Sequence, residues 1–131
     1  VVGIGNAMVD AIIPSNQSEI EKHDINRDSM NLIDENLKNN LHESYNIKEM
    51  AGGGSLGNSM FGITSFGGNG SFIGKIKNDE IGVYLQKDMV REGLKFPLGF
   101  TSPDISTGCC TIFVDTNYLF KEVYNFSFEL M

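Results

Sequence analysis

The chain has 131 residues, of which 40% are hydrophobic and 21% are charged, a composition typical of folded proteins. Its 10 lysines and arginines stand against 17 aspartates and glutamates, which gives a formal net charge of -7. This charge repels phosphate backbones and anionic membrane surfaces, so we expect neither nucleic acid nor a membrane as a partner. No apolar run approaches the roughly 20 residues that a membrane-spanning helix needs.

The amino-terminal residues alternate between apolar and polar segments. Val1–Ile4 is a short β-branched run that predicts a buried strand, and Ala11–Ile13 predicts a second strand that stops at Pro14. Residues 15–48 are the most polar part of the chain and predict a surface excursion between core elements.

Two short helices are expected within this polar segment, at 17–22 and 34–42. In the second, Asp34 is placed to cap the amino end, and Leu37 and Leu41 fall on one helical face.

A glycine-rich run then leads into the most regular part of the sequence. Ser55 is the expected amino-terminal cap of a helix of about three turns that ends at Gly67. Residues 71–73 predict a strand. A further helix is expected from a cap at Asn78 to a stop at Gly93, with an apolar stripe formed by Ile81, Leu85 and Met89.

The order strand, glycine turn, helix, strand, helix is typical of an α/β protein with a largely parallel sheet. The last part differs, because residues 109–114 and 118–124 are β-prone and flank a turn-like segment at 115–117. These residues predict a hairpin.

Polar side chains follow the first strand. Asn6 and Asp10 lie beyond its carboxyl end, the place where open α/β sheets bind ligands. The alternative is that both residues only satisfy hydrogen bonds of a local turn. A dinucleotide-binding loop is not expected, because Gly3-x-Gly5 lacks its third glycine, whose place is taken by Met8.

The run Gly52–Ser55 leads into a helix, so its backbone N–H groups could hold an anion. It is not a Walker loop, because no Gly-Lys-Ser/Thr follows. A flexible linker or a close backbone approach explains the glycines equally well. Asn58, one turn into the helix, could direct its amide into the same crevice.

Histidines and cysteines predict no metal site and no nucleophile. His23 and His42 lie in the polar segment without ligand-like spacing to cysteine and are expected to be solvated surface residues. Cys109 and Cys110 are adjacent, so they point to opposite faces of a strand and do not bond to each other. They are expected to pack in the core, in a reducing, cytoplasmic setting.

Several linked motifs together resemble the PfkB (ribokinase-like) carbohydrate and nucleoside kinases. They are G-N-A-M-V-D (5–10), G-G-S-L-G-N-S (53–59), F-G-G (66–68) and F-I-G-K-I-K-N-D-E-I-G (72–82), in the family's order and spacing. The stretch S-M-N-L-I-D-E (29–35) is similar to the adenosine-kinase-like branch. The resemblance covers about residues 1–114.

This resemblance implies a ribokinase-like, Rossmann-type α/β core, present in part, with a small β-sheet lid. All 131 residues would belong to the amino-terminal part of a kinase domain, with the core at about 1–10 and 51–106 and the lid at about 11–50 and 107–124. It also implies that Asn6, Asp10 and Asn58 bind sugar hydroxyls, and that Gly53 and Gly54 form the switch on which the lid closes.

The implied activity is ATP-dependent phosphorylation of a hydroxyl of a sugar or nucleoside. The catalytic base and the ATP and Mg²⁺ sites of the family lie in its carboxyl-terminal half, so this chain is expected to bind neither cofactor and to be inactive alone. Two alternatives stay open. One is a non-catalytic sugar- or nucleoside-binding fragment, and the other is a module that forms homodimers through edge strands of the lid.

Overall fold

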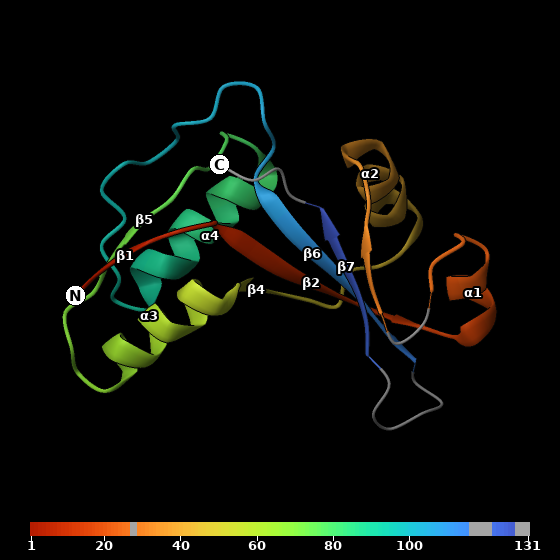
Figure 1. Ribbon diagram of the computed structural model, residues 1–131, viewed down its shortest axis with the longest axis horizontal. Helices are drawn as coiled ribbons and strands as arrows, with labels where there is room; N and C mark the ends of the chain where they lie inside the picture. Colours follow the sequence, from red (N-terminus) through yellow and green to blue (C-terminus); the bar gives the residue numbers. More distant parts are fainter. Residues whose placement is uncertain (27–28, 116–121, 128–131) are drawn as a thin grey trace. The chain divides into compact units, whose positions relative to one another are not determined.

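The computed structural model describes residues 1–26, 29–115 and 122–127. It confirms a mixed α/β fold (Figure 1). In chain order the elements are β1 (Val2–Ile4), β2 (Met8–Ser15), α1 (Gln17–Glu21), β3 (Met30–Leu32), α2 (Glu35–Ser44), β4 (Glu49–Gly53), α3 (Ser55–Ser65), β5 (Ser71–Ile73), α4 (Glu80–Arg91), β6 (Gly108–Asp115) and β7 (Glu122–Ser127).

The chain forms two compact units. Unit 1 contains Val1–Val9 and Ala51–Gly108, and unit 2 contains Asp10–Met50 and the described residues from Cys109 onward. The chain passes from one unit to the other within β2 and β4 and at the start of β6.

Unit 1 is built on a parallel pair of strands, β1 and β5, in which Gly3 lies opposite Phe72 (Figure 1). Helix α3 packs on this pair, and a Cβ atom on Gly3 would lie 2.9 Å from Met60 Sδ. The other face of β1 is open, because Val2 and Ile4 are 62% and 69% exposed. The strand at Val1–Ile4 is therefore confirmed, but the prediction that it is buried is wrong, since helices cover only one face of the pair.

Helix α3 begins one residue earlier than the sequence predicted. Gly54 is its amino-terminal cap, with φ of 79°, whereas Ser55 already lies inside the helix. Ser55 is therefore not the cap, because the chain turns into the helix through a backbone conformation that strongly favours glycine. The end is as predicted, with Gly67 at φ of 81° and the N–H of Gly68 donating to Ile63 O at 2.9 Å.

Helix α4 is capped by Asp79 and not by the predicted Asn78. Asp79 Oδ1 accepts from the N–H of Gly82 at 2.7 Å and from Thr107 Oγ1 at 2.8 Å, and Asp79 Oδ2 accepts from Thr107 N at 2.9 Å. One carboxylate thus joins the start of the helix to the residue before β6. The predicted stripe of Ile81, Leu85 and Met89 is buried.

The sheet of unit 2 has five strands in the order β3-β7-β6-β2-β4. Strands β6 and β7 are antiparallel, which confirms the pairing of the predicted hairpin, but β7 continues to Ser127, opposite Cys109, and so extends beyond the predicted end at residue 124. Residues 116–121, where the sequence predicts part of the turn and the start of the second strand, lie outside the described residues. Strand β3 was not predicted, because Met30–Leu32 is short and lies in a polar segment.

Strand β2 continues through Pro14 to Ser15, so the predicted stop at proline is wrong. Pro14 is exposed and second from the end of the strand, where the loss of one N–H donor disturbs the sheet least.

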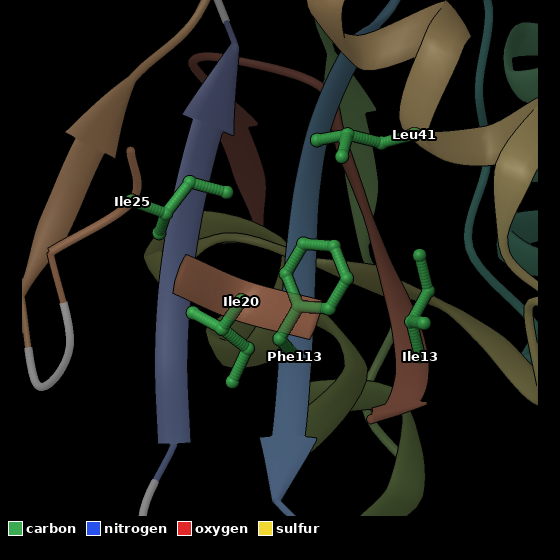
Figure 2. Packing of buried hydrophobic residues seen from close by; sticks show 5 residues of the cluster. All are labelled: Ile13, Ile20, Ile25, Leu41 and Phe113. Carbon is green, nitrogen blue, oxygen red and sulfur yellow. The ribbon is translucent and has the colours of Figure 1, made fainter. Parts of the chain in front are cut away.

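The core of unit 2 contradicts the prediction of a surface excursion at 15–48. Five buried side chains pack together, and Figure 2 shows them gathered at the sheet: Ile13, Ile20, Ile25, Leu41 and Phe113. Helices α1 and α2 therefore cover one face of this sheet. The capping predictions for α2 are confirmed, because Asp34 Oδ1 accepts from Leu37 N at 2.8 Å and Leu41 is fully buried.

The histidines are half-buried and not solvated. His23 Nε2 lies 2.8 Å from the Tyr45 hydroxyl, and His42 Nε2 lies 2.9 Å from Thr111 Oγ1. Both residues therefore link the helical layer of unit 2 to its sheet or to the segment after α2. Cys109 and Cys110 are both buried, as predicted.

Candidate functional site

The predicted site residues of unit 1 are brought together around Gly54. A Cβ atom on Gly54 would lie 3.9 Å from the backbone oxygen of Asn6, so the segment after β1 runs beside the start of α3. The backbone N–H of Asn58 donates to Gly54 O at 2.9 Å. The bond between Asn58 and Gly54 is an ordinary bond of the helix, whereas Asn6 is distant in sequence and is brought beside Gly54 by the fold of unit 1.

The start of α3 has the features of a binding surface for polar groups. Its cap, Gly54, offers no side-chain acceptor, and the first turn contains no acidic residue. The first backbone N–H groups of the helix therefore have no side-chain partner at the cap, and the helix dipole favours electron-rich atoms there. The Asn58 side chain is exposed one turn further on.

Asn6 is half-buried, and no hydrogen-bond partner for its side chain is found among the described residues. The turn-satisfying role that the sequence left open for Asn6 therefore has no support in this part of the chain. Gly53 is buried at the end of β4, so the first two glycines of the run belong to a strand and not to a loop. This corrects the prediction of a glycine loop from Gly52 onward.

Asp10 belongs to unit 2 and lies on the sheet face opposite to the hydrophobic core. Successive residues of a strand point to opposite faces, so Asp10 lies opposite to Ile13 on β2, and Cys110 lies opposite to Phe113 on β6. Ile12 and Ile112 share the face of Asp10 and are half-buried. Asp10 is thus a carboxylate set among apolar side chains on the face away from the core cluster.

Burial raises the pKa of the Asp10 carboxyl, and a hydrogen bond from Cys110 lowers it in part. A thiol is a weak donor, so the carboxylate oxygens keep most of their capacity to accept hydrogen bonds. The sequence did not predict Cys110 as a neighbour of Asp10. No local signal could have done so, because the contact depends on the pairing of strands that lie 100 residues apart.

A cavity of about 520 Å³ opens elsewhere on unit 1. Its lining residues are Lys77, Asn78, Phe100, Thr101, Ser102 and Pro103. None of the predicted site residues is among them.

The described residues show neither a cluster of metal-ligating side chains nor a Walker loop. They contain no group of three or more histidine, cysteine, aspartate or glutamate residues able to hold a metal ion. The glycine run ends in Ser-Leu-Gly, without the lysine of a Walker loop. Within the same residues, every helix is too short or too polar to span a bilayer.

Solved kinase structures match this chain. Adenosine kinase from Sinorhizobium meliloti superposes with a TM-score of 0.79 at 29% identity, over 96% of this chain and 38% of that kinase. A probable sugar kinase from Rhizobium etli CFN 42 gives a TM-score of 0.78 at 26% identity with the same coverage. An Anopheles gambiae adenosine kinase, solved in complex with P1,P4-di(adenosine-5) tetraphosphate, gives 0.78 at 22% identity, again over 96% and 38%.

The chain therefore has the ribokinase-like fold of adenosine and sugar kinases, and the resemblance read from the sequence motifs is confirmed. It spans about two fifths of the length of these kinases. No protein-family model matches the chain, and no curated protein matches it either.

Proposed function

We propose that this chain supplies the substrate-binding part of an ATP-dependent kinase that phosphorylates a hydroxyl of a sugar or nucleoside. The observation that carries the proposal is Asp10, a partly buried carboxylate on the face away from the core of unit 2, in a chain with the fold of adenosine and sugar kinases. A carboxylate that accepts from two vicinal hydroxyls orients a ribose strongly, because hydrogen bonds to charged acceptors are short and strong.

The other residues are assigned by their chemistry. The amides of Asn6 and Asn58 can donate to and accept from hydroxyl groups, and the backbone N–H groups at Gly53 and Gly54 can follow a ligand as the protein closes. In such an enzyme unit 2 would be the lid. By resemblance, the catalytic base and the ATP and Mg²⁺ sites of such an enzyme lie in its carboxyl-terminal half.

Calorimetric titration of the 131-residue chain with adenosine, ribose and adenine tests the proposal. We expect saturable binding of adenosine or ribose and none of adenine, because the proposed contacts are made to sugar hydroxyls. 2′-Deoxyadenosine should bind about tenfold more weakly than adenosine, because it lacks the 2′-hydroxyl and loses the hydrogen bond that this group would donate.

The same samples should release no ADP from ATP above background, with or without ligand, because no described group stabilises a phosphoryl group in transfer. Ligand-dependent ADP release would contradict the prediction that the chain is inactive alone. Equal binding of adenine and adenosine would contradict recognition through the sugar.

One observation favours a second function, a module that associates through its sheet. Strand β3 is at the edge of the five-stranded sheet, and its Met30 and Leu32 are 57% and 71% exposed. Exposed apolar edge strands are sites of pairing with another chain. Concentration-dependent association in sedimentation, together with no binding of any ligand, would favour this function over the first.

A further inference from the structure

Helix α4 carries a buried carboxylate that its apolar stripe does not require. Asp88 is 5% exposed and lies beside the buried Leu85 and Met89. A buried carboxylate is unfavourable unless it is paired and hydrogen-bonded. Here Oδ2 accepts from the backbone N–H of Gly52 at 2.8 Å, and Oδ1 is paired with the exposed guanidinium of Arg91.

The absence of a side chain at Gly52 leaves room for this contact. A Cβ atom there would lie 2.9 Å from Asp88 Oδ2 and 2.8 Å from Phe61 Cζ, so any side chain would displace the carboxylate or the ring. The φ angle of Gly52 is not positive, whereas that of Gly54 is 79°. Two glycines of one run therefore serve different purposes, the first for close approach and the third for backbone conformation.

Hydrogen bonds hold the backbone at both ends of the segment from Gly52 to Gly54. Asp88 fixes the backbone at Gly52, and on the other side the N–H of Asn58 donates to Gly54 O at the start of α3. The backbone around Gly53 is therefore held by hydrogen bonds at Gly52 and at Gly54. The N–H groups assigned to the substrate belong to this short stretch.

We propose that Asp88 is a positioning residue for substrate binding, which acts by fixing the backbone of Gly52 and thereby the N–H groups of Gly53 and Gly54. This inference rests on the proposed function, because it assigns a ligand to those groups. Asp88 itself does not touch the ligand.

Three variants test the role of Asp88 in the 131-residue chain. Asp88→Leu keeps the branching of the side chain, with two methyl groups in place of the two oxygens, and removes the acceptor. Asp88→Asn keeps an oxygen where Gly52 needs it. Arg91→Gln is the matched control, since it removes the ion pair and leaves the bond to Gly52.

We expect Asp88→Leu to speed hydrogen exchange at the Gly52 amide and to weaken binding of adenosine and ribose by about tenfold, because the ligand must then order backbone that Asp88 orders in the wild type. Asp88→Asn and Arg91→Gln should stay within about threefold of the wild type. The readouts are amide exchange by NMR, calorimetric affinity and thermal melts.

Faster exchange at Gly52 with unchanged affinity for both ligands would overturn the inference, because Asp88 would then serve the fold alone. An Asp88→Leu variant that does not fold would overturn it for the same reason. If the wild type binds neither ligand, the proposed function fails, and the assignment of Asp88 to ligand binding fails with it. The exchange rates then report separately whether Asp88 fixes Gly52.

Discussion

Replacing Asp10 by alanine should weaken binding of adenosine or ribose by about one to two orders of magnitude. A hydrogen bond to a charged group contributes roughly 1.5–3 kcal/mol, and every 1.4 kcal/mol or so is tenfold in affinity. Calorimetric titration of both proteins measures the change. Asp104→Ala removes an exposed carboxylate of unit 1 and is the control, with an expected change below about twofold.

In the Asp10→Asn variant, we expect ligand affinity to fall and stability at neutral pH to rise. Burial raises the pKa of Asp10, so the folded chain holds this proton more tightly than the unfolded chain does. The free energy of unfolding therefore falls as the pH rises from the ordinary carboxyl pKa through the raised one. At neutral pH the charged group lowers stability, so Asp10→Asn should melt at a higher temperature while it binds ligand more weakly.

This combination separates a binding residue from a structural cap. If Asp10 accepted turn hydrogen bonds, its loss would lower the melting temperature and leave the affinity unchanged. Below the ordinary carboxyl pKa both proteins carry a neutral group, so the difference between their melting temperatures should disappear. A lower melting temperature for Asp10→Asn at neutral pH, with wild-type affinity, would remove Asp10 from the proposed site.

Gly82→Ala should destabilise unit 1 by roughly 3 kcal/mol or more, because overpacking and the loss of a helix cap add. A Cβ atom there would lie 2.1 Å from the backbone oxygen of Lys77 and 2.6 Å from Thr107 Oγ1. A backbone oxygen cannot move aside cheaply, so the bonds of Asp79 to Gly82 and Thr107 should break. Urea denaturation followed by circular dichroism measures the effect.

Gly62→Ala is the matched control for Gly82→Ala. Gly62 lies inside α3, and a Cβ atom there would meet nothing within 4 Å. Alanine is better than glycine in a helix interior by about 1 kcal/mol, so this variant should be more stable than the wild type. Equal stability of the Gly82→Ala variant and the wild type would contradict the packing described around Gly82.

Local features of the fold were predictable only in part, because the caps expected at Ser55 and Asn78 are each one residue away from the observed caps. Contacts across the chain were not predictable. The cap at Asp34 and the stripe of Ile81, Leu85 and Met89 depend on residues within one helix, and both are confirmed. Ile20 and Ile25 are isolated apolar residues in a polar segment without periodicity. Their burial depends in part on Phe113 of β6, which is distant in sequence, so residues 15–48 were wrongly expected at the surface.

The candidate site follows the same division. The motifs identified Asn6, Asp10, Gly53, Gly54 and Asn58, and their roles remain proposals. What surrounds them was not predictable, because Gly52 meets Asp88 and Asp10 meets Cys110 only after the chain has folded. A glycine in a sequence does not reveal whether it serves conformation or close approach. Only the backbone angles and the contacts of the folded chain distinguish the two roles.

The central claim is that these residues bind a sugar or nucleoside, and amide chemical shifts test it most directly. Adenosine should be titrated into the ¹⁵N-labelled 131-residue chain. The backbone amide resonances of Gly53, Gly54 and Asp10 should shift. The side-chain amide resonances of Asn6 and Asn58 should shift with them. The shifts should saturate together. Saturable shifts confined to other residues, or none at any concentration of adenosine or ribose, would contradict the claim.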